Sequence, residues 1–200
     1  LWARHHLDRA GGALRAKQIA FWAERLAGAH ALVLPTQRPR PDYVQDAGAT
    51  LPFELSVAEV APLRAVAQAG AATLYLVVLA AFQLYLGRLA SVDDVLLLTP
   101  YAVRDQPETE RMVGDFMNVL PMRVVLNPED TVPKILPRVR TFALEAYENA
   151  DVPIHEVLNA AQVGATVLYQ LVSEANMGWD LDAAAWGLEA VSMVESGWGG

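Results

Sequence analysis

Apolar positions recur with helical spacing in two early parts of the chain. Between residues 13 and 26, Ile19, Trp22, Ala23 and Leu26 fall on one face of a helix, and Gly28 follows as a stop signal. Residues 73–86 form the strongest apolar segment of the chain. Because a helix that is apolar on all sides must be buried, this segment predicts the central core helix.

Shorter apolar runs predict strands. Residues 94–99 are rich in valine and leucine, which is typical of a fully buried strand. Residues 119–126 predict a second strand, interrupted at Pro121. Since proline cannot donate a ladder hydrogen bond, we expect a sheet edge or a crossing segment at that point. Residues 50–55, 168–175 and 188–194 predict further strands.

Polar residues mark the start of further helices. Ser56, followed by Glu59 three positions later, predicts a capping box and a helix over residues 57–68. Within that helix, Pro62 allows a kink or a short 3₁₀ start. Pro153 opens a short helix that ends near residue 160.

A turn at residues 127–130 precedes the last long helix, which we expect Thr131 to cap and which runs to residue 147. Pro137 is expected to kink it. Its inward face is predicted to hold Ile135, Val139, Phe142, Ala143 and Ala146. Helices and strands therefore mix along the chain, which indicates an α/β (α+β) sandwich lobe.

Composition narrows the possible functions. The chain has 200 residues, 54% of them hydrophobic, which is enough for one sizeable core. The net charge is -8 and the basic residues are scattered, so we expect no nucleic-acid partner. There is no cysteine, which excludes a disulfide framework, a cysteine zinc site and a thiol nucleophile, and fits a cytoplasmic protein. The apolar segment at 73–86 is shorter than the roughly 20 residues of a membrane span, so no membrane partner is expected.

Three stretches carry a more specific pattern. Residues 34–41 read LPTQRPRP, residues 113–123 read VGDFMNVLPMR, and residues 149–156 read NADVPIHE. In this order and at these distances they resemble the "LPTDRPRP", "GxFVNTLxLR" and "HQDVPFE" blocks of the condensation domain of nonribosomal peptide synthetases. Other stretches resemble further blocks of that family, so the resemblance spans nearly the whole chain: LWA at 1–3, FWAERLAGA at 21–29, GAATLY at 70–75 and PYAVR at 100–104.

The resemblance implies a domain organisation. The chain begins at Leu1 and lacks a signal-peptide pattern, and we expect it to be a piece of a longer polypeptide. Residues 1–200 would be a partial condensation domain whose lobe is like half of chloramphenicol acetyltransferase. Residues 1–41 would form a connecting helix and an extended proline-rich segment, and residues 42–200 a C-terminal lobe truncated at its end.

The resemblance also implies an activity. Condensation domains form an amide bond between acyl or aminoacyl thioesters carried by two carrier proteins. The implied partners are peptidyl or acyl carrier protein domains and the N-terminal lobe of the same domain. The domain itself is expected to bind no cofactor, because the phosphopantetheine arms belong to the partner carriers.

The candidate site residues lie in the second block. The family's matching asparagine comes near the tunnel where the substrates meet, which points to Asn118 here, with Gly114 and Phe116 at their expected offsets. An amide side chain can donate and accept, so it could hold a pantetheine amide or an acyl group. The alternative from spacing alone is that Asn118 caps a turn. Residues 35–41 are read as a rigid extended linker.

No catalytic residue is expected within this chain. His5 and His6 imitate the family's catalytic "HHxxxDG" block, but Ala10 stands where the aspartate belongs, and the pair follows Trp2 although the true block lies well upstream of that position. They are interpreted as a surface or helix-end pair, and His155 as a partly exposed helix residue. No pair of histidines has metal-ligand spacing, so no metal site is expected.

One family block is degraded, and this keeps alternatives open. The "RDxSRNPLFQ" block should fall at residues 161–170, where only Leu168, Tyr169 in place of phenylalanine, and Gln170 remain. The first hypothesis is a fragment of an amide-forming condensation domain. The second is a non-catalytic docking module of the same fold for a carrier protein or tailoring enzyme, and the third a free-standing acyltransferase that uses coenzyme A.

Overall fold

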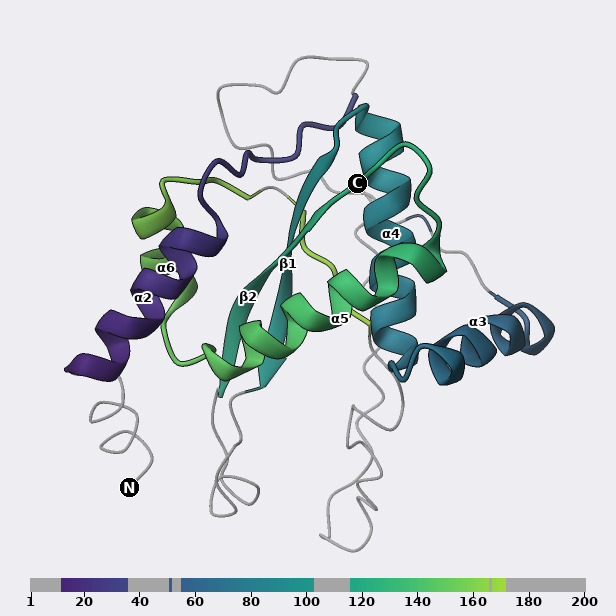
Figure 1. Ribbon diagram of the computed structural model, residues 1–200, viewed down its shortest axis with the longest axis horizontal. Helices are drawn as coiled ribbons and strands as arrows, with labels where there is room; N and C mark the ends of the chain where they lie inside the picture. Colours follow the sequence, from purple (N-terminus) through teal and green to yellow (C-terminus); the bar gives the residue numbers. More distant parts are fainter. Residues whose placement is uncertain (1–11, 36–50, 52–54, 103–115, 166, 172–200) are drawn as a thin grey trace, which may run out of the picture. The chain divides into compact units, whose positions relative to one another are not determined.

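The computed structural model describes residues 12–35, 51, 55–102, 116–165 and 167–171. The chain divides into two compact units, residues 1–170 and 171–200, and the helices and strands described below belong to the first. Figure 1 shows these elements, whose labels are kept here. In chain order they are α2 (Ala13–Arg25), α3 (Val57–Ala69), α4 (Leu74–Ala90), β1 (Asp94–Ala102), β2 (Met117–Val125), α5 (Val132–Glu148) and α6 (Ile154–Ala161). The predicted mixture of helices and strands is confirmed.

Strands β1 and β2 pair antiparallel along their whole lengths, with Leu97 opposite Met122. On its other side β1 forms a parallel bridge from Leu98 to Leu168. There the Leu98 N–H donates to the Val167 carbonyl at 2.9 Å, and the Tyr169 N–H donates to the Leu98 carbonyl at 2.8 Å. Within the described residues β1 is therefore flanked on both sides, whereas β2 is an edge strand.

The expected interruption at Pro121 is wrong, because β2 continues through it. Pro121 lies opposite Leu98, whose own N–H and C=O point toward residues 167–169. The Leu98–Pro121 pair is thus one that exchanges no hydrogen bonds, and the proline nitrogen points to the open edge. No ladder bond to β1 is lost, and among the described residues Pro121 lies on an edge strand, as expected.

Helix α4 is the core helix that its apolar sequence predicts. It begins after Thr73, whose hydroxyl accepts the Leu76 N–H at 3.3 Å. Leu79 is fully buried, and the Gln83 amide donates to the Met122 carbonyl at 3.0 Å, which ties the helix to β2. Burial does not extend to every face, since Tyr85 is 59% exposed.

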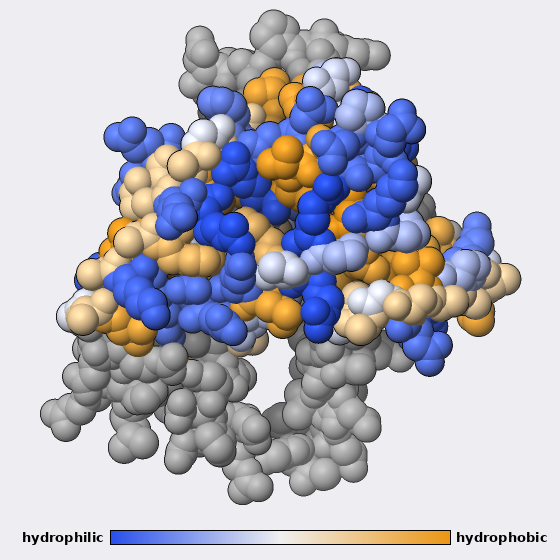
Figure 2. Space-filling model, viewed as in Figure 1, coloured by the Kyte–Doolittle hydropathy of each residue, from blue (hydrophilic) through white to orange (hydrophobic). Residues whose placement is uncertain are grey.

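Helix α3 begins with the predicted capping box, in which Ser56 and Glu59 bond each other's backbone N–H groups. It is one α-helix through Pro62, and the predicted 3₁₀ start is absent. Apolar colours are conspicuous over α3 at the right of Figure 2.

In the part of the chain that the structure describes, no single helix is long and apolar enough to cross a membrane. Helices α3 and α4 reach that standard only as a pair, which is bent by 104°.

Helix α5 lies across the sheet and packs against α4 and β2 (Figure 1). Four of its five predicted inward residues are buried, and Phe142 is half-buried. Thr131 occupies the N-cap position but makes no side-chain cap bond, and the helix continues through Pro137. The turn before it is closed by Asp130, whose carboxylate accepts the Asn127 N–H at 2.7 Å. This bond lowers the pKa of Asp130, and Arg138 lowers it further. Because the two effects outweigh desolvation, which raises the pKa, it lies below its ordinary value.

Helices α2 and α6 lie side by side (Figure 1). Helix α2 begins after Gly12, whose φ of 81° suits glycine, and ends close to its predicted boundary. Helix α6 begins after Pro153 as predicted, and Arg15 on α2 pairs with Glu156 on α6.

The remaining strand predictions fare differently. Leu51 and Leu55 lie in no strand, and the residues between them are not described. Of the predicted strand 168–175 only the bridge at Leu168 is seen, and residues 188–194 lie outside the described part. The proposed division at residues 41 and 42 also lies outside it and stays a prediction.

Candidate functional site

Asn118 lies inside strand β2, not in a turn, and its side chain is fully engaged as a donor. The amide nitrogen donates to the carbonyl of Ala150 at 2.7 Å and to that of Val152 at 2.9 Å. The amide oxygen accepts the N–H of Val119 at 2.8 Å. Asn118 therefore joins β2 to the loop between α5 and α6 while it satisfies a backbone N–H that points away from β1.

Two side chains of α2 also donate hydrogen bonds to the α5–α6 loop. The indole N–H of Trp22 donates to the Asn149 carbonyl at 2.9 Å. The amide of Gln18 donates to the Glu148 carbonyl at 3.4 Å and to the Asp151 carboxylate at 2.9 Å. We call this arrangement the loop clasp; its members are Gln18, Trp22, Asn118 and residues 148–152.

The loop clasp joins three stretches of this chain that resemble family blocks. Trp22 lies in the stretch FWAERLAGA at 21–29, Asn118 in the block at 113–123, and the carbonyls that accept from Trp22 and Asn118 in the block at 149–156. Their contacts join residues more than 30 positions apart through backbone carbonyls. Buried carbonyls need donors, and the clasp supplies them.

The chemistry open to the clasp is limited by these bonds. A primary amide has two N–H donors, and both N–H groups of Asn118 are used. Only a lone pair of its oxygen is left for a substrate, so Asn118 could accept a hydrogen bond from a pantetheine amide but not donate one. The carbonyl oxygen of Gln18 is buried without a hydrogen-bond partner, which leaves one unmet acceptor in the clasp.

Aromatic side chains stand beside Asn118. Tyr101 is its cross-strand partner, and the Tyr101 ring stacks on that of Tyr147 from α5, with centroids 5.0 Å apart. Burial, together with the nearby Tyr75 and Tyr101, raises the pKa of Tyr147 to about 12, so its hydroxyl stays protonated near neutral pH. Phe116 is buried as the block enters β2.

The predicted site residues thus have different outcomes. Asn118 and Phe116 are placed at one end of the sheet, and Gly114 lies outside the described residues. Contrary to the turn-cap alternative, Asn118 is not itself part of a turn, but its amide bonds two carbonyls of the turn between α5 and α6. Its contact with a substrate stays a prediction. Sequence reasoning missed Gln18, although a polar residue four positions before Trp22 lies on the buried face of α2 and could have been noticed.

The histidines do not form a site in the described part of the chain. His155 is exposed on α6, with 72% of its side chain accessible and its ring 3.9 Å from Glu156, as its interpretation as a helix surface residue expects. His30 is also exposed, while His5 and His6 lie outside the described residues. No group of three or more His, Cys, Asp or Glu residues there could hold a metal ion.

Tyr169, in the poorly matched block at 161–170, packs against other aromatic rings. The Tyr169 ring is buried and lies 5.3 Å from that of Tyr75 and 5.8 Å from that of Phe82, between centroids. Its hydroxyl donates to the Tyr75 carbonyl at 3.3 Å. Burial raises the pKa of Tyr169 well above its ordinary value. Tyr169, at the position where the resemblance expects phenylalanine, therefore packs against two aromatic rings and makes one hydrogen bond through its hydroxyl.

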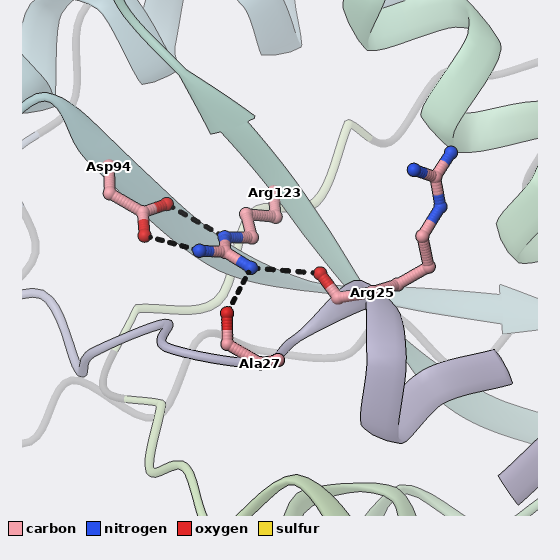
Figure 3. A network of polar contacts seen from close by, with 4 residues as sticks. All are labelled: Arg25, Ala27, Asp94 and Arg123. Carbon is pink, nitrogen blue, oxygen red and sulfur yellow. Dashed lines mark hydrogen bonds and ion pairs between the residues drawn. The ribbon is translucent and has the colours of Figure 1, made fainter. Parts of the chain in front are cut away.

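Arg123 closes the block at the other end of β2. Its guanidinium donates to both oxygens of Asp94, at 2.9 and 2.7 Å, and to the carbonyls of Arg25 and Ala27, at 2.9 and 3.0 Å. Figure 3 shows all four bonds, with the side chain of Arg25 directed away from Arg123. The arginine joins β1, β2 and the end of α2, and its bonds give it a structural role.

Comparisons with known proteins agree with the sequence blocks. A family model described as "Condensation domain" matches residues 1–183. One of the linear gramicidin synthase proteins of Brevibacillus parabrevis is 37% identical over 170 residues, which cover 84% of this chain and 3% of that protein. The beauvericin nonribosomal cyclodepsipeptide synthetase of Beauveria bassiana is 33% identical over 174 residues, which cover 81% and 6%. This chain therefore spans only a small part of the length of the curated relatives it matches.

Solved structures share the fold. The complex of the X-domain and OxyB from teicoplanin biosynthesis contains a chain that matches with a TM-score of 0.73 and 26% identity, covering 83% of this chain and 37% of that one. The first condensation domain of the CDA synthetase matches with a TM-score of 0.70 and 17% identity, covering 85% and 38%. The latter shows the fold alone, and it confirms the predicted α/β (α+β) condensation-domain lobe.

Proposed function

Because the chain belongs to the condensation-domain family, we propose that it is part of a nonribosomal peptide synthetase domain that forms amide bonds between carrier-bound acyl or aminoacyl thioesters. The observation that carries this proposal is the family match over residues 1–183, supported by 37% identity to a linear gramicidin synthase. The loop clasp supports it further, since it brings together the stretches 21–29, 113–123 and 149–156, each of which resembles a family block.

In the proposed reaction the amine of one carrier-bound substrate attacks the thioester carbon of the other. A carbon–nitrogen bond forms, the carbon–sulfur bond breaks, and the amine proton ends on the released thiol. Much of the rate comes from holding the two groups in contact. A histidine of the upstream "HHxxxDG" block would move the proton or orient the amine. This lobe would supply one wall of the substrate tunnel, at the end of the sheet where Asn118, Tyr101 and Phe116 lie.

The proposed partners follow from this chemistry. Two carrier protein domains would insert phosphopantetheine arms from opposite sides, and the N-terminal lobe of the same domain would complete the tunnel. The domain would bind no cofactor of its own and would act in the cytoplasm. Asn118, Gly114 and Phe116 remain the proposed tunnel residues, with Asn118 limited to accepting a hydrogen bond.

Dipeptide formation tests the proposal. The intact synthetase that contains this chain is loaded with an aminoacyl group on each flanking carrier, and the product is followed in a single turnover. We expect an amide product that disappears when the second histidine of the upstream block is replaced by alanine. A wild-type protein that holds both substrates yet forms no amide would contradict the proposal.

Two observations favour a second candidate, a non-catalytic docking module. The block at 161–170 has lost its arginines and aspartate, and among the similar structures is an X-domain in complex with OxyB. In that case the intact domain would bind a carrier or a tailoring enzyme and form no amide. A binding measurement beside the turnover assay separates the two candidates.

A further inference from the structure

A hollow of about 560 Å³ lies beside the C-terminal half of β2. Helix α5 forms one wall with Pro137, Thr141 and Phe142, and the end of α2 contributes Arg25. The hollow is lined by Arg25, Arg123, Val124, Val125, Pro137, Arg138, Thr141 and Phe142. It lies at the opposite end of β2 from Asn118 and so is separate from the proposed tunnel site.

The charge of the lining is one-sided, with three arginines and no acidic residue. Arg25 and Arg138 are each about 40% exposed, and each gives one N–H to an acidic partner, Glu145 and Asp130 respectively. A guanidinium has five N–H donors, so both retain donors for a ligand. Arg25 is further held by its place 5.7 Å from the ring centre of Phe142. Exposed ion pairs of this kind are weak and can be shared with an incoming carboxylate.

The edge of β2 adds a second kind of donor. The Leu126 N–H bonds the Asp93 carbonyl at 2.6 Å, so even-numbered residues of β2 bond toward β1 and odd-numbered residues point to the open edge. At that edge the Val119 N–H is taken by Asn118, and Pro121 has none. The backbone groups of Arg123 and Val125 also point outward, beside the hollow, and no described residue pairs with them.

These features together define what the hollow can hold. An extended chain would pair with the outward-pointing backbone groups of Arg123 and Val125, as in the addition of a strand to a sheet edge. Its acidic side chains would meet Arg25 and Arg138, and its apolar side chains would cover Phe142 and the half-exposed Val125. We propose that this groove binds an acidic segment of a partner polypeptide in extended conformation. Such binding is independent of amide formation.

Fluorescence anisotropy can test the proposal with the 200-residue chain. The probe is a labelled peptide of alternating valine and glutamate, six residues long with blocked ends, and its counterpart carries lysine in place of glutamate. We expect the acidic peptide to bind at least tenfold more tightly than the basic one, and added salt to weaken it. Equal binding of both peptides, or binding of neither, would overturn the proposal.

Variants separate the two kinds of contact. Arg25→Gln and Arg138→Gln should each weaken binding by roughly five- to tenfold, whereas Lys17→Gln on the exposed side of α2 should not. Val125→Pro removes an outward N–H without loss of a ladder bond, as Pro121 does four residues earlier, and should weaken binding at least tenfold. If Val125→Pro binds as tightly as the wild type, the site is for an anion only and strand addition is refuted.

Hydrogen exchange on the wild-type chain gives a readout that needs no variant. Binding of the acidic peptide should slow exchange of the Arg123 and Val125 amides, while Val124, already bonded to β1, should change little. Protection elsewhere but not at these two amides would contradict the placement. Two further outcomes would contradict the proposal. One is displacement of the peptide by inorganic phosphate at equal concentration, and the other is occupation of the edge by a second copy of the chain.

Discussion

Asn118 is the residue whose replacement says most about the candidate site. Its side chain makes three hydrogen bonds, two of them to carbonyls of the α5–α6 loop. Each contributes about 1 kcal/mol net, so Asn118→Ala should lower the free energy of unfolding by about 2–3 kcal/mol. From sequence alone we expect slowed condensation with little change in melting; the structure changes that expectation, because the clasp loosens as well.

Denaturant unfolding measures the stability loss, and single-turnover dipeptide formation by the intact domain measures the rate per folded molecule. The rate should fall roughly five- to a hundred-fold, in line with one lost hydrogen bond to a bound group. Asn159→Ala on the exposed side of α6 is the matched control and should alter neither quantity. Reduced stability with an unchanged rate would make Asn118 purely structural, and unchanged stability would contradict the clasp.

His6 offers a test in the opposite direction. The histidine pair at positions 5 and 6 follows Trp2, whereas the family's catalytic block lies upstream of that position, so no role in proton transfer is expected. His6→Ala in the intact synthetase should leave dipeptide formation within about twofold of wild type, a change of less than about 0.5 kcal/mol in the barrier. Loss of activity in a folded variant would show that the surface interpretation is wrong.

At this scale the sequence can indicate which residues matter but not what they bind. The groups that accept hydrogen bonds from Asn118 are backbone carbonyls 32 and 34 residues away. Because every residue has a backbone carbonyl, the residue type at those positions does not reveal the bond. The chemistry of its amide allows it both to donate and to accept, and only the fold shows that both donors are used. Periodicity places Trp22 on the buried face of its helix, but its indole N–H bond depends equally on the loop position.

Among the elements, α4 carries the clearest prediction. Leu79 is fully buried in the middle of the helix. Leu79→Asp forces a carboxylate into an apolar core without a partner, and should cost more than about 4 kcal/mol, which is enough to prevent folding. Leu89→Asp on the same helix, at a site 43% exposed, should cost about 1 kcal/mol or less. Circular dichroism and a urea titration distinguish the two, and a cooperatively folding Leu79→Asp protein would contradict the core placement.

Arg123 tests how the strands are joined to α2. A lysine keeps the charge but cannot make two bonds to Asp94 and two more to the carbonyls of Arg25 and Ala27. Arg123→Lys should lower the unfolding free energy by about 2 kcal/mol. Arg64→Lys, on the exposed surface of α3, should change it by less than about 0.5 kcal/mol. Equal unfolding midpoints for the two variants would show that the network in Figure 3 adds nothing.

Element types follow well from periodicity, whereas the effects of prolines do not. The sequence predicts a strand interrupted at Pro121, yet the strand continues because the proline nitrogen faces the open edge. Pro62 lies within one continuous helix at an exposed position, where water can reach the carbonyl that lost its partner. Whether a proline breaks an element depends on which side of it is already bonded, and that is a property of the assembled fold.

For the whole molecule, the ordered set of blocks is enough to indicate the family, and the family match over residues 1–183 confirms it. The blocks do not show which of them lie in contact in the folded chain. The α5–α6 loop receives donors from α2 and β2, so blocks far apart in sequence serve one small region. The groove at the other end of β2 is assembled from residues of α2, β2 and α5, and of its lining only Arg25 and Arg123 lie in stretches that resemble family blocks.

The last prediction concerns the 200-residue chain by itself. The only paired histidines are His5 and His6, which lack the family's aspartate at position 10, so no group suited to the proton transfer is expected here. The lobe would also supply only one wall of the tunnel, and the advantage of holding both substrates in contact would be lost. Incubated with two loaded carrier proteins, the chain should form dipeptide no faster than the carriers do alone. Adding the upstream lobe as a separate polypeptide is the informative companion experiment: restored turnover would place the catalytic group there, while amide formation by the isolated chain would show that its own residues suffice.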